Sequence, residues 1–121
     1  MRSKWLPIAV LAGVMSVQPA FAELAKVETK EAFVQLVSGK TLSRPLIKLQ
    51  VDASGTITGR GVRWDVTGQW AWKDGYFCRD MNWGGTEIGY NCQEVRVKDG
   101  RIRFTSDKGR GDSAVFRLKP E

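Results

Sequence analysis

The two cysteines, Cys78 and Cys92, are the residues whose type most narrowly limits the chemistry of this chain. Two thiols could bind a metal, act as a redox pair or form a disulfide. A zinc site needs about four ligands, whereas the chain has two cysteines and no histidine. A redox pair usually has the spacing Cys-x-x-Cys, which is absent here. Whether the two cysteines pair then depends on the compartment, because disulfides persist in oxidising environments.

The N-terminal segment predicts export into such an environment. Two basic residues precede an uncharged apolar run over residues 5–17, and Ala20 and Ala22 supply the small side chains that a signal peptidase reads. This pattern indicates a signal peptide over 1–22 and a single domain over 23–121. The apolar run is shorter than the roughly 20 residues that span a bilayer. We therefore expect a periplasmic or secreted protein with a disulfide between its cysteines.

The composition indicates one small domain with a mild positive charge. The chain has 121 residues, 19 basic against 13 acidic, and a net charge of +6. No dense stripe of Lys and Arg suggests a nucleic-acid partner, and no later segment is apolar enough to predict a membrane span. A domain of this size has a thin core. A disulfide that closes a loop of about 15 residues, which is worth about 3 kcal/mol by chain entropy, would therefore matter.

Carboxylates are the remaining residues that could catalyse a reaction. Asp80 and Glu94 are the most interesting, because alternation along the chain places them on the same face as the cysteines. An acid/base pair needs two such groups close together, one of them with a raised pKa. Ser113 has no histidine to act as its base, and Ser38-Gly39-Lys40-Thr41 lacks the first glycine of a phosphate-binding loop. The sequence therefore predicts no catalytic residue, no metal site and no cofactor.

The tryptophans are the densest signal in the chain. Trp64, Trp70 and Trp72 share one parity, which is typical of core packing, although a small barrel can also hold one apolar ligand. Trp83 lies in a glycine-rich stretch, where it either contacts a partner or folds back over the barrel mouth. The candidate binding residues are Trp83, Tyr90, Asp80, Trp64, Trp70 and Trp72.

The pattern of elements predicts a barrel that positions these residues. Residues 29–38 have helical apolar spacing, and from there on the apolar residues alternate with polar ones. Turn signals at Asp52-Ala53-Ser54-Gly55, Lys73-Asp74-Gly75 and Lys98-Asp99-Gly100 divide the chain into short strands. We expect a mainly β fold, a small antiparallel up-and-down barrel of seven or eight strands, capped by one short N-terminal helix.

A hairpin that brings the cysteines together fixes its other pairs as well. If Cys78 faces Cys92, then Asp80 faces Tyr90 and Tyr76 faces Glu94. The connection would run from Trp83 to Glu87, and the disulfide would hold its base still.

Several segments resemble a set of small exported alphaproteobacterial proteins. They are LVSGKTLSRP, DASGTITGR, WDVTGQWAWKDGYFCRD, IGYNCQEV and RIRFTSDKGRGDSAVFRL. The chain is also similar to broader lipocalin-like families. The resemblance implies a small barrel and supplies no catalytic residues. Such proteins often carry the label dihydrodipicolinate reductase, but that enzyme is a longer cytoplasmic nicotinamide enzyme, and this chain lacks Gly-x-Gly-x-x-Gly and histidine.

These observations favour an exported, non-enzymatic binding protein. Its partner would be a small apolar ligand or an envelope protein, and it would neither bind nucleic acid nor span a membrane. One alternative is a periplasmic inhibitor of a lysozyme-like enzyme, although the positive charge would slow association with basic lysozymes. The other is an enzyme, either a hydrolase that uses carboxylates or the reductase of the label.

Overall fold

A computed structural model describes residues 24–121, so the predicted signal peptide lies outside the described residues. In chain order the elements are β1 (Ala25–Lys26), α1 (Lys30–Val37), β2 (Lys40–Arg44), β3 (Ile47–Val51), β4 (Thr56–Gly61), β5 (Trp64–Lys73), β6 (Tyr76–Trp83), β7 (Thr86–Glu87), β8 (Asn91–Lys98), β9 (Arg101–Thr105), α2 (Ser106–Gly109) and β10 (Ser113–Pro120). Within residues 24–121, no helix has both the length and the apolar character required to cross a bilayer.

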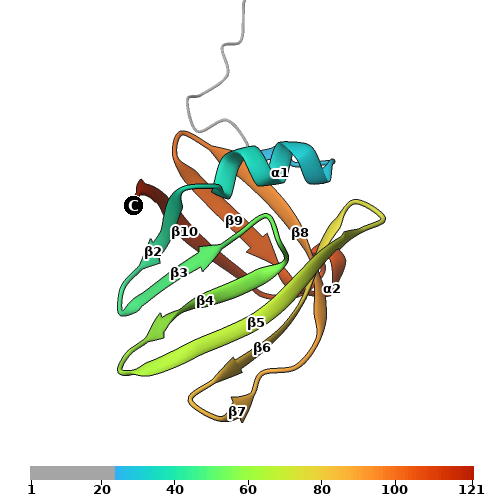
Figure 1. Ribbon diagram of the computed structural model, residues 1–121. Helices are drawn as coiled ribbons and strands as arrows, with labels where there is room; N and C mark the ends of the chain where they lie inside the picture. The colour runs from blue at the N-terminus through green and yellow to red at the C-terminus, as the bar shows by residue number, and fades with distance from the viewer. Residues whose placement is uncertain (1–23) are drawn as a thin grey trace, which may run out of the picture.

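Eight of the strands close into an antiparallel barrel in which each strand pairs with the next barrel strand along the chain and the last pairs with the first (Figure 1). The order is β2-β3-β4-β5-β6-β8-β9-β10. The barrel closes where β10 pairs with β2, with Leu118 opposite Leu42. The short strands β1 and β7 are added beside β8 and β6. The predicted up-and-down barrel with a short N-terminal helix is confirmed, and closure leaves few unpaired edges.

Helix α1 closes one end of the barrel (Figure 1). The hydroxyl of Thr29 accepts a hydrogen bond from the backbone N–H of Ala32 at 3.1 Å and caps the first turn. Phe33 and Val37 then point into the barrel and are fully buried. Because Phe33 contacts the rings of four aromatic residues, it joins the helix to the strands; these residues are Trp70, Trp72, Phe77 and Phe104.

The predicted tight turns form where the sequence places them. Asp74 and Gly75 have φ values of 53° and 86°, and Asp99 and Gly100 have 49° and 78°. Two consecutive positive φ values are those of the two-residue turn that suits the twist of a hairpin. Each pair joins two neighbouring barrel strands, β5 to β6 and β8 to β9. These turns help to set the register on which the interior depends.

Candidate functional site

The barrel contains a cavity of about 140 Å³ that no residue of α1 lines. Most of the wall is apolar, and two side chains bring polar groups to it, Arg79 and Gln93. The apolar lining residues are Leu42, Leu49, Val51, Ile57, Phe77, Met81, Phe104, Ala114 and Phe116. Phe77 and Phe104 also contact Phe33, so the aromatic cluster below the helix forms the inner limit of the cavity.

Arg79 is a cation buried in this wall. Its side chain lies on the inward face of β6, between the inward-facing Phe77 and Met81, and the residue is 8% exposed. One terminal nitrogen, Nη1, donates a hydrogen bond to the carbonyl oxygen of Gly89 at 2.7 Å. The Nε–H of Arg79 is buried and has no hydrogen-bond partner. A buried hydrogen-bond donor without a partner costs free energy, so a ligand that brought an acceptor to this nitrogen would remove that cost.

The charge of Arg79 is not matched by an acid in the cavity, because none of the lining residues is acidic. The carboxylate of Asp80 is next in the chain but lies on the outer face, exposed to solvent. Burial lowers the pKa of Arg79 and the charge of Asp80 works against this effect. An arginine still keeps its proton at neutral pH. The cavity therefore combines apolar walls with one positive charge.

The position of Arg79 follows from the strand pairing. β6 pairs with β8 at Phe77–Gln93, Cys78–Cys92 and Arg79–Asn91, and the ladder ends there. Further along, β6 pairs with β7, at Asn82–Glu87 and Trp83–Thr86. Arg79 thus sits on the last rung of the seam between β6 and β8, where the barrel wall changes partner.

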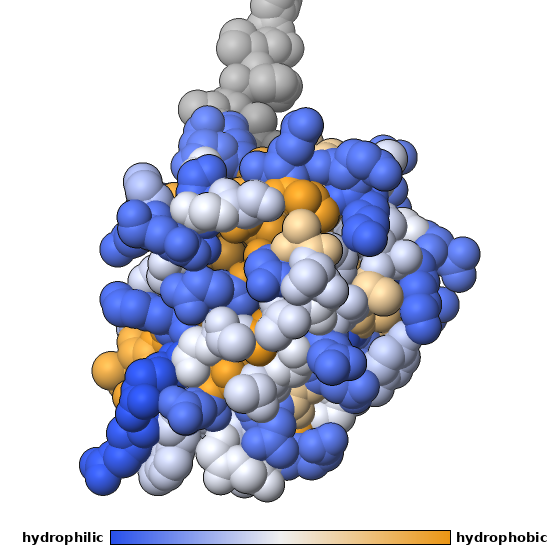
Figure 2. All heavy atoms as spheres, viewed as in Figure 1, coloured by the Kyte–Doolittle hydropathy of each residue, from blue (hydrophilic) through white to orange (hydrophobic). Residues whose placement is uncertain are grey.

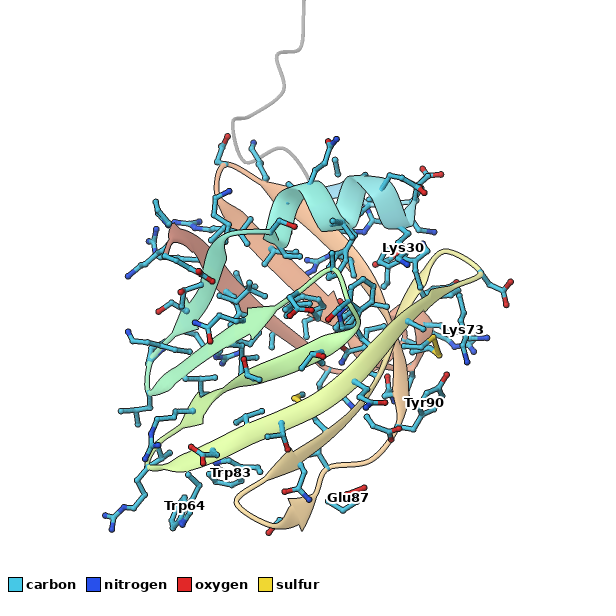
Figure 3. The ribbon with its side chains drawn as sticks, viewed as in Figure 1. Lys30, Trp64, Lys73, Trp83, Glu87 and Tyr90 are labelled. Atoms are coloured by element: carbon cyan, nitrogen blue, oxygen red, sulfur yellow. A yellow bond between two sulfur atoms is a disulfide. The ribbon has the colours of Figure 1, made fainter. Side chains whose placement is uncertain are left out.

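The disulfide between Cys78 and Cys92 joins the same two strands at the adjacent rung, on the outer face. The predicted bridge is therefore confirmed, and an intramolecular disulfide is typical of proteins outside the cytoplasm. The hydroxyl of Tyr90 lies 3.5 Å from Sγ of Cys92. Nζ of Lys73 is also 3.5 Å from that hydroxyl, and Figure 3 shows the two side chains together at this edge. The covalent link thus fixes the rung next to Arg79.

The other pairs expected from the cysteine register do not form. The β6–β8 ladder ends at Arg79–Asn91, so Asp80 does not pair with Tyr90. At its other end the ladder begins with Phe77–Gln93, so it does not include Tyr76 and Glu94. For Asp80 and Tyr90 the reason is a shift of one residue between the β6–β8 and β6–β7 ladders, which leaves Ile88, Gly89 and Tyr90 as an irregular segment.

The predicted aromatic site residues do not line the cavity. Trp70 is buried, donates from Nε1 to the carbonyl oxygen of Asp52 at 2.9 Å and packs below the helix. Trp72 stacks on Phe33, with ring centroids 5.2 Å apart. These two indoles fill the helix end of the barrel. Trp64 is half exposed, at the start of β5, and Tyr90 is exposed at 56%. Their roles in binding stay predictions.

Trp83 folds back onto the barrel, which is the second of the two expected arrangements. It ends strand β6, and its Nε1 donates to the carbonyl oxygen of Gly61 at 2.8 Å. A Cβ atom at position 61 would lie 3.0 Å from this nitrogen, so the close approach of the indole depends on glycine. The ring of Trp64 meets Trp83 edge-on at 5.5 Å, and Figure 3 shows the pair at the end away from α1.

The two carboxylates considered for acid/base chemistry do not form a site. Asp80 is exposed on the outer face of β6. Glu94 accepts hydrogen bonds from Nε and Nη2 of Arg96 at 3.0 and 3.2 Å. This pairing, with the charges of Arg96, Lys26 and Arg103, lowers the pKa of Glu94 although burial opposes it. A general acid needs the opposite shift.

Sequence reasoning missed Arg79, Gln93 and Met81 as members of a site. The signal was present, because Arg79 has the same parity as Phe77 and Met81 in β6. A charged residue within an inward-facing series is a recognisable anomaly.

Searches with protein-family models, curated proteins and solved structures give no match to this chain. Within residues 24–121, no group of three or more side chains suited to metal binding comes together.

Proposed function

We propose that the protein is an exported, non-enzymatic binding protein that holds a small ligand inside its barrel, as lipocalin-like proteins do. The proposed ligand has a compact apolar body and one anionic group. The body would occupy the space beside Phe104 and Phe116. The anionic group would lie against the guanidinium of Arg79 and accept the hydrogen bond that its Nε–H does not make within the protein.

The observation that carries this proposal is the buried and incompletely paired Arg79 in an apolar wall. Removing a cation from water costs several kcal/mol, and the attraction of a counter-ion offsets that cost only with good geometry. No acidic side chain lines the cavity to provide that attraction. A carboxylate ligand would supply both the charge and the acceptor, since charge-assisted hydrogen bonds are the strong ones.

The size of the cavity limits the ligand to a small molecule. Its volume of about 140 Å³ is close to that of an engineered protein cavity, roughly 150 Å³, that binds benzene. A single aromatic ring or a short branched chain fits such a space, whereas a long acyl chain does not. The proposed class is therefore aromatic or short aliphatic carboxylic acids of about six to eight carbons.

A titration with three probes of similar shape tests the proposal. Benzoate, benzyl alcohol and benzylamine carry negative, neutral and positive polar groups at pH 7, and calorimetry measures the affinity of each. We expect benzoate to bind at least about tenfold more tightly than benzyl alcohol, because a hydrogen bond to a charged group contributes roughly 1.5–3 kcal/mol. Benzylamine should not bind. Equal affinities, or no binding by any probe, would reject the proposed ligand class.

Two further assays separate this proposal from its alternatives. A protein that protects cells from lysozyme yet binds none of the three probes would favour the inhibitor hypothesis. A nicotinamide-dependent absorbance change would favour the reductase label. The proposal expects benzoate binding with neither lysis protection nor turnover.

A further inference from the structure

The β2–β3 and β4–β5 hairpin tips lie at the end of the barrel away from α1 (Figure 1). Both tips expose large apolar side chains. Leu46, between β2 and β3, is 75% exposed, and Val62, between β4 and β5, is 53% exposed. Trp64, two residues further on, is 48% exposed. The backbone N–H of Val62 donates to the carbonyl oxygen of Leu46 at 2.7 Å, so the two tips lie side by side. We call Leu46, Val62 and Trp64 the tip patch.

The backbone at both tips has a conformation that favours glycine. Leu46 has a φ of 68° and Val62 a φ of 59°. Residues other than glycine rarely adopt such φ values, and a β-branched residue such as valine is a genuine outlier there. Leu46 follows Pro45 in a two-residue turn, at the position that glycine or asparagine usually occupies. Because both side chains are exposed, packing within the protein does not explain their presence, and local strain of this kind often accompanies function.

Basic side chains surround the tip patch. An open groove of about 520 Å³ beside Leu46 is lined by no carboxylate, and its basic side chains are Arg44, Lys48, Arg101, Arg117 and Lys119. On the other side, the guanidinium of Arg63 lies 5.6 Å from the ring centroid of Trp64. Asp65, which follows Trp64 in the chain, is paired with Arg60 at 2.9 Å. Figure 2 shows apolar atoms beside strongly hydrophilic ones at the left edge, where these turns lie in Figure 1.

We infer that the tip patch docks the protein on the surface of an anionic lipid bilayer. Leu46 and Val62 enter the boundary between headgroups and acyl chains, and Trp64 takes the interfacial position that tryptophan favours. The cations of Arg44, Lys48 and Arg63 stay at the level of the lipid phosphates. A soluble polyanion would satisfy the basic groups, but it offers no apolar phase for two exposed aliphatic side chains. The bilayer therefore fits both halves of the surface.

Vesicle sedimentation measures this docking directly. Because residues 5–17 are apolar and would themselves bind lipid, the assay uses the chain from Glu23, which contains the whole barrel and its core. We expect the chain to sediment with phosphatidylglycerol-containing vesicles and not with pure phosphatidylcholine vesicles. High salt should weaken the binding, since screening reduces the attraction of exposed charges. Failure to bind phosphatidylglycerol vesicles at low salt would overturn the inference.

Replacing the strained tip residues by glycine separates docking from folding. The double variant Leu46→Gly, Val62→Gly should keep or raise the melting temperature, because glycine adopts these φ values without strain. It should nevertheless bind anionic vesicles at least about tenfold more weakly, since the inserted apolar surface is lost. Ile88→Ala is the control for an exposed apolar residue elsewhere, as Ile88 is 48% exposed and lies outside the patch, and should bind like the parent chain.

Charge variants complete the test. Arg44→Gln and Lys48→Gln should each weaken binding about fivefold, because a basic residue near an anionic surface contributes roughly 1 kcal/mol. Lys30→Gln, at the opposite end in α1, should leave binding unchanged. If the glycine double variant bound vesicles as tightly as the parent, Leu46 and Val62 would not insert into the bilayer and the inference would fail. If heparin bound the parent and the double variant equally and displaced the vesicles, the partner would be a soluble polyanion and the inference would also fail.

Discussion

At the scale of single residues, replacing Arg79 should affect stability and ligand binding differently. Arg79→Met removes a buried charge and keeps most of the volume, so the free energy of unfolding should stay within about 1 kcal/mol of the parent value or rise. The same change should reduce the affinity for benzoate to that for benzyl alcohol, because the charged donor is gone. Urea unfolding and calorimetry measure the two effects.

Arg103→Met is the matched control for this experiment. Arg103 also has a buried Nε without a hydrogen-bond partner, but it lies on β9 outside the cavity lining. Benzoate affinity should therefore not change. A loss of binding in both variants would indicate a general effect of positive charge and would count against a specific role of Arg79.

Trp83 gives a second prediction at this scale. Trp83→Phe keeps an aromatic ring but removes the donor to the carbonyl oxygen of Gly61. The free energy of unfolding should fall by about 1 kcal/mol or somewhat more, because a part-buried hydrogen bond and part of the indole are lost. Trp64→Phe, at a half-exposed ring, should cost less than about 0.5 kcal/mol. Equal losses in chemical denaturation would show that the bond to Gly61 contributes nothing special.

The sequence predicts whether a residue faces the inside or the outside of the barrel, but it does not predict how deeply that residue is buried. Parity correctly grouped Trp70 and Trp72 as inward-facing residues, but it also grouped Trp64 with them, and Trp64 is half exposed because β5 begins at the barrel rim. The same alternation placed Arg79 on the inward face, yet a cation is not expected inside a barrel. A filled interior and a cavity also give the same alternation, so the pocket was not predictable.

At the scale of elements, the disulfide should hold the seam between β6 and β8 together. That seam has three paired rungs, of which the cysteines form the middle one. Replacing both cysteines by alanine should lower the free energy of unfolding by about 3 kcal/mol, since the sequence separation is 14 residues. Amides that exchange by global unfolding should all speed up, and residues 77–79 and 91–93 should speed up further because the seam also loses its covalent link. If these residues accelerated no more than the rest of the barrel, the disulfide would act on the unfolded chain alone.

The regular elements were predictable because their signals are local. The expected helix over residues 29–38 forms as α1, capped by Thr29, and the Asp-Gly turns form where expected. The end of the β6–β8 ladder was not predictable, because it depends on a one-residue shift at residues 88–90 that no short pattern encodes. For the same reason the pairing of Asp80 with Tyr90 was wrong although that of the cysteines was right.

At the scale of the whole molecule, stability should depend on pH through Glu94. Its pKa is below the ordinary value of 4.5 in the folded protein, because Arg96 donates hydrogen bonds to the carboxylate. The unfolded chain therefore binds the proton more readily, and this contribution to stability is complete above about pH 4.5 and disappears as the pH falls through the lowered pKa. Glu94→Gln should flatten part of the fall in unfolding free energy below pH 5, as measured by urea unfolding. Parallel curves for the two proteins would contradict this assignment.

The central claim is that the barrel binds a small acid with its carboxylate at Arg79. The most direct measurement is a crystal structure with 4-bromobenzoate, in which anomalous scattering locates the bromine. We predict a bromine signal inside the barrel, among the apolar residues that line the cavity, and the carboxylate within hydrogen-bond distance of the Arg79 guanidinium. An empty cavity at saturating ligand, or a bromine signal confined to the outer surface, would contradict the claim.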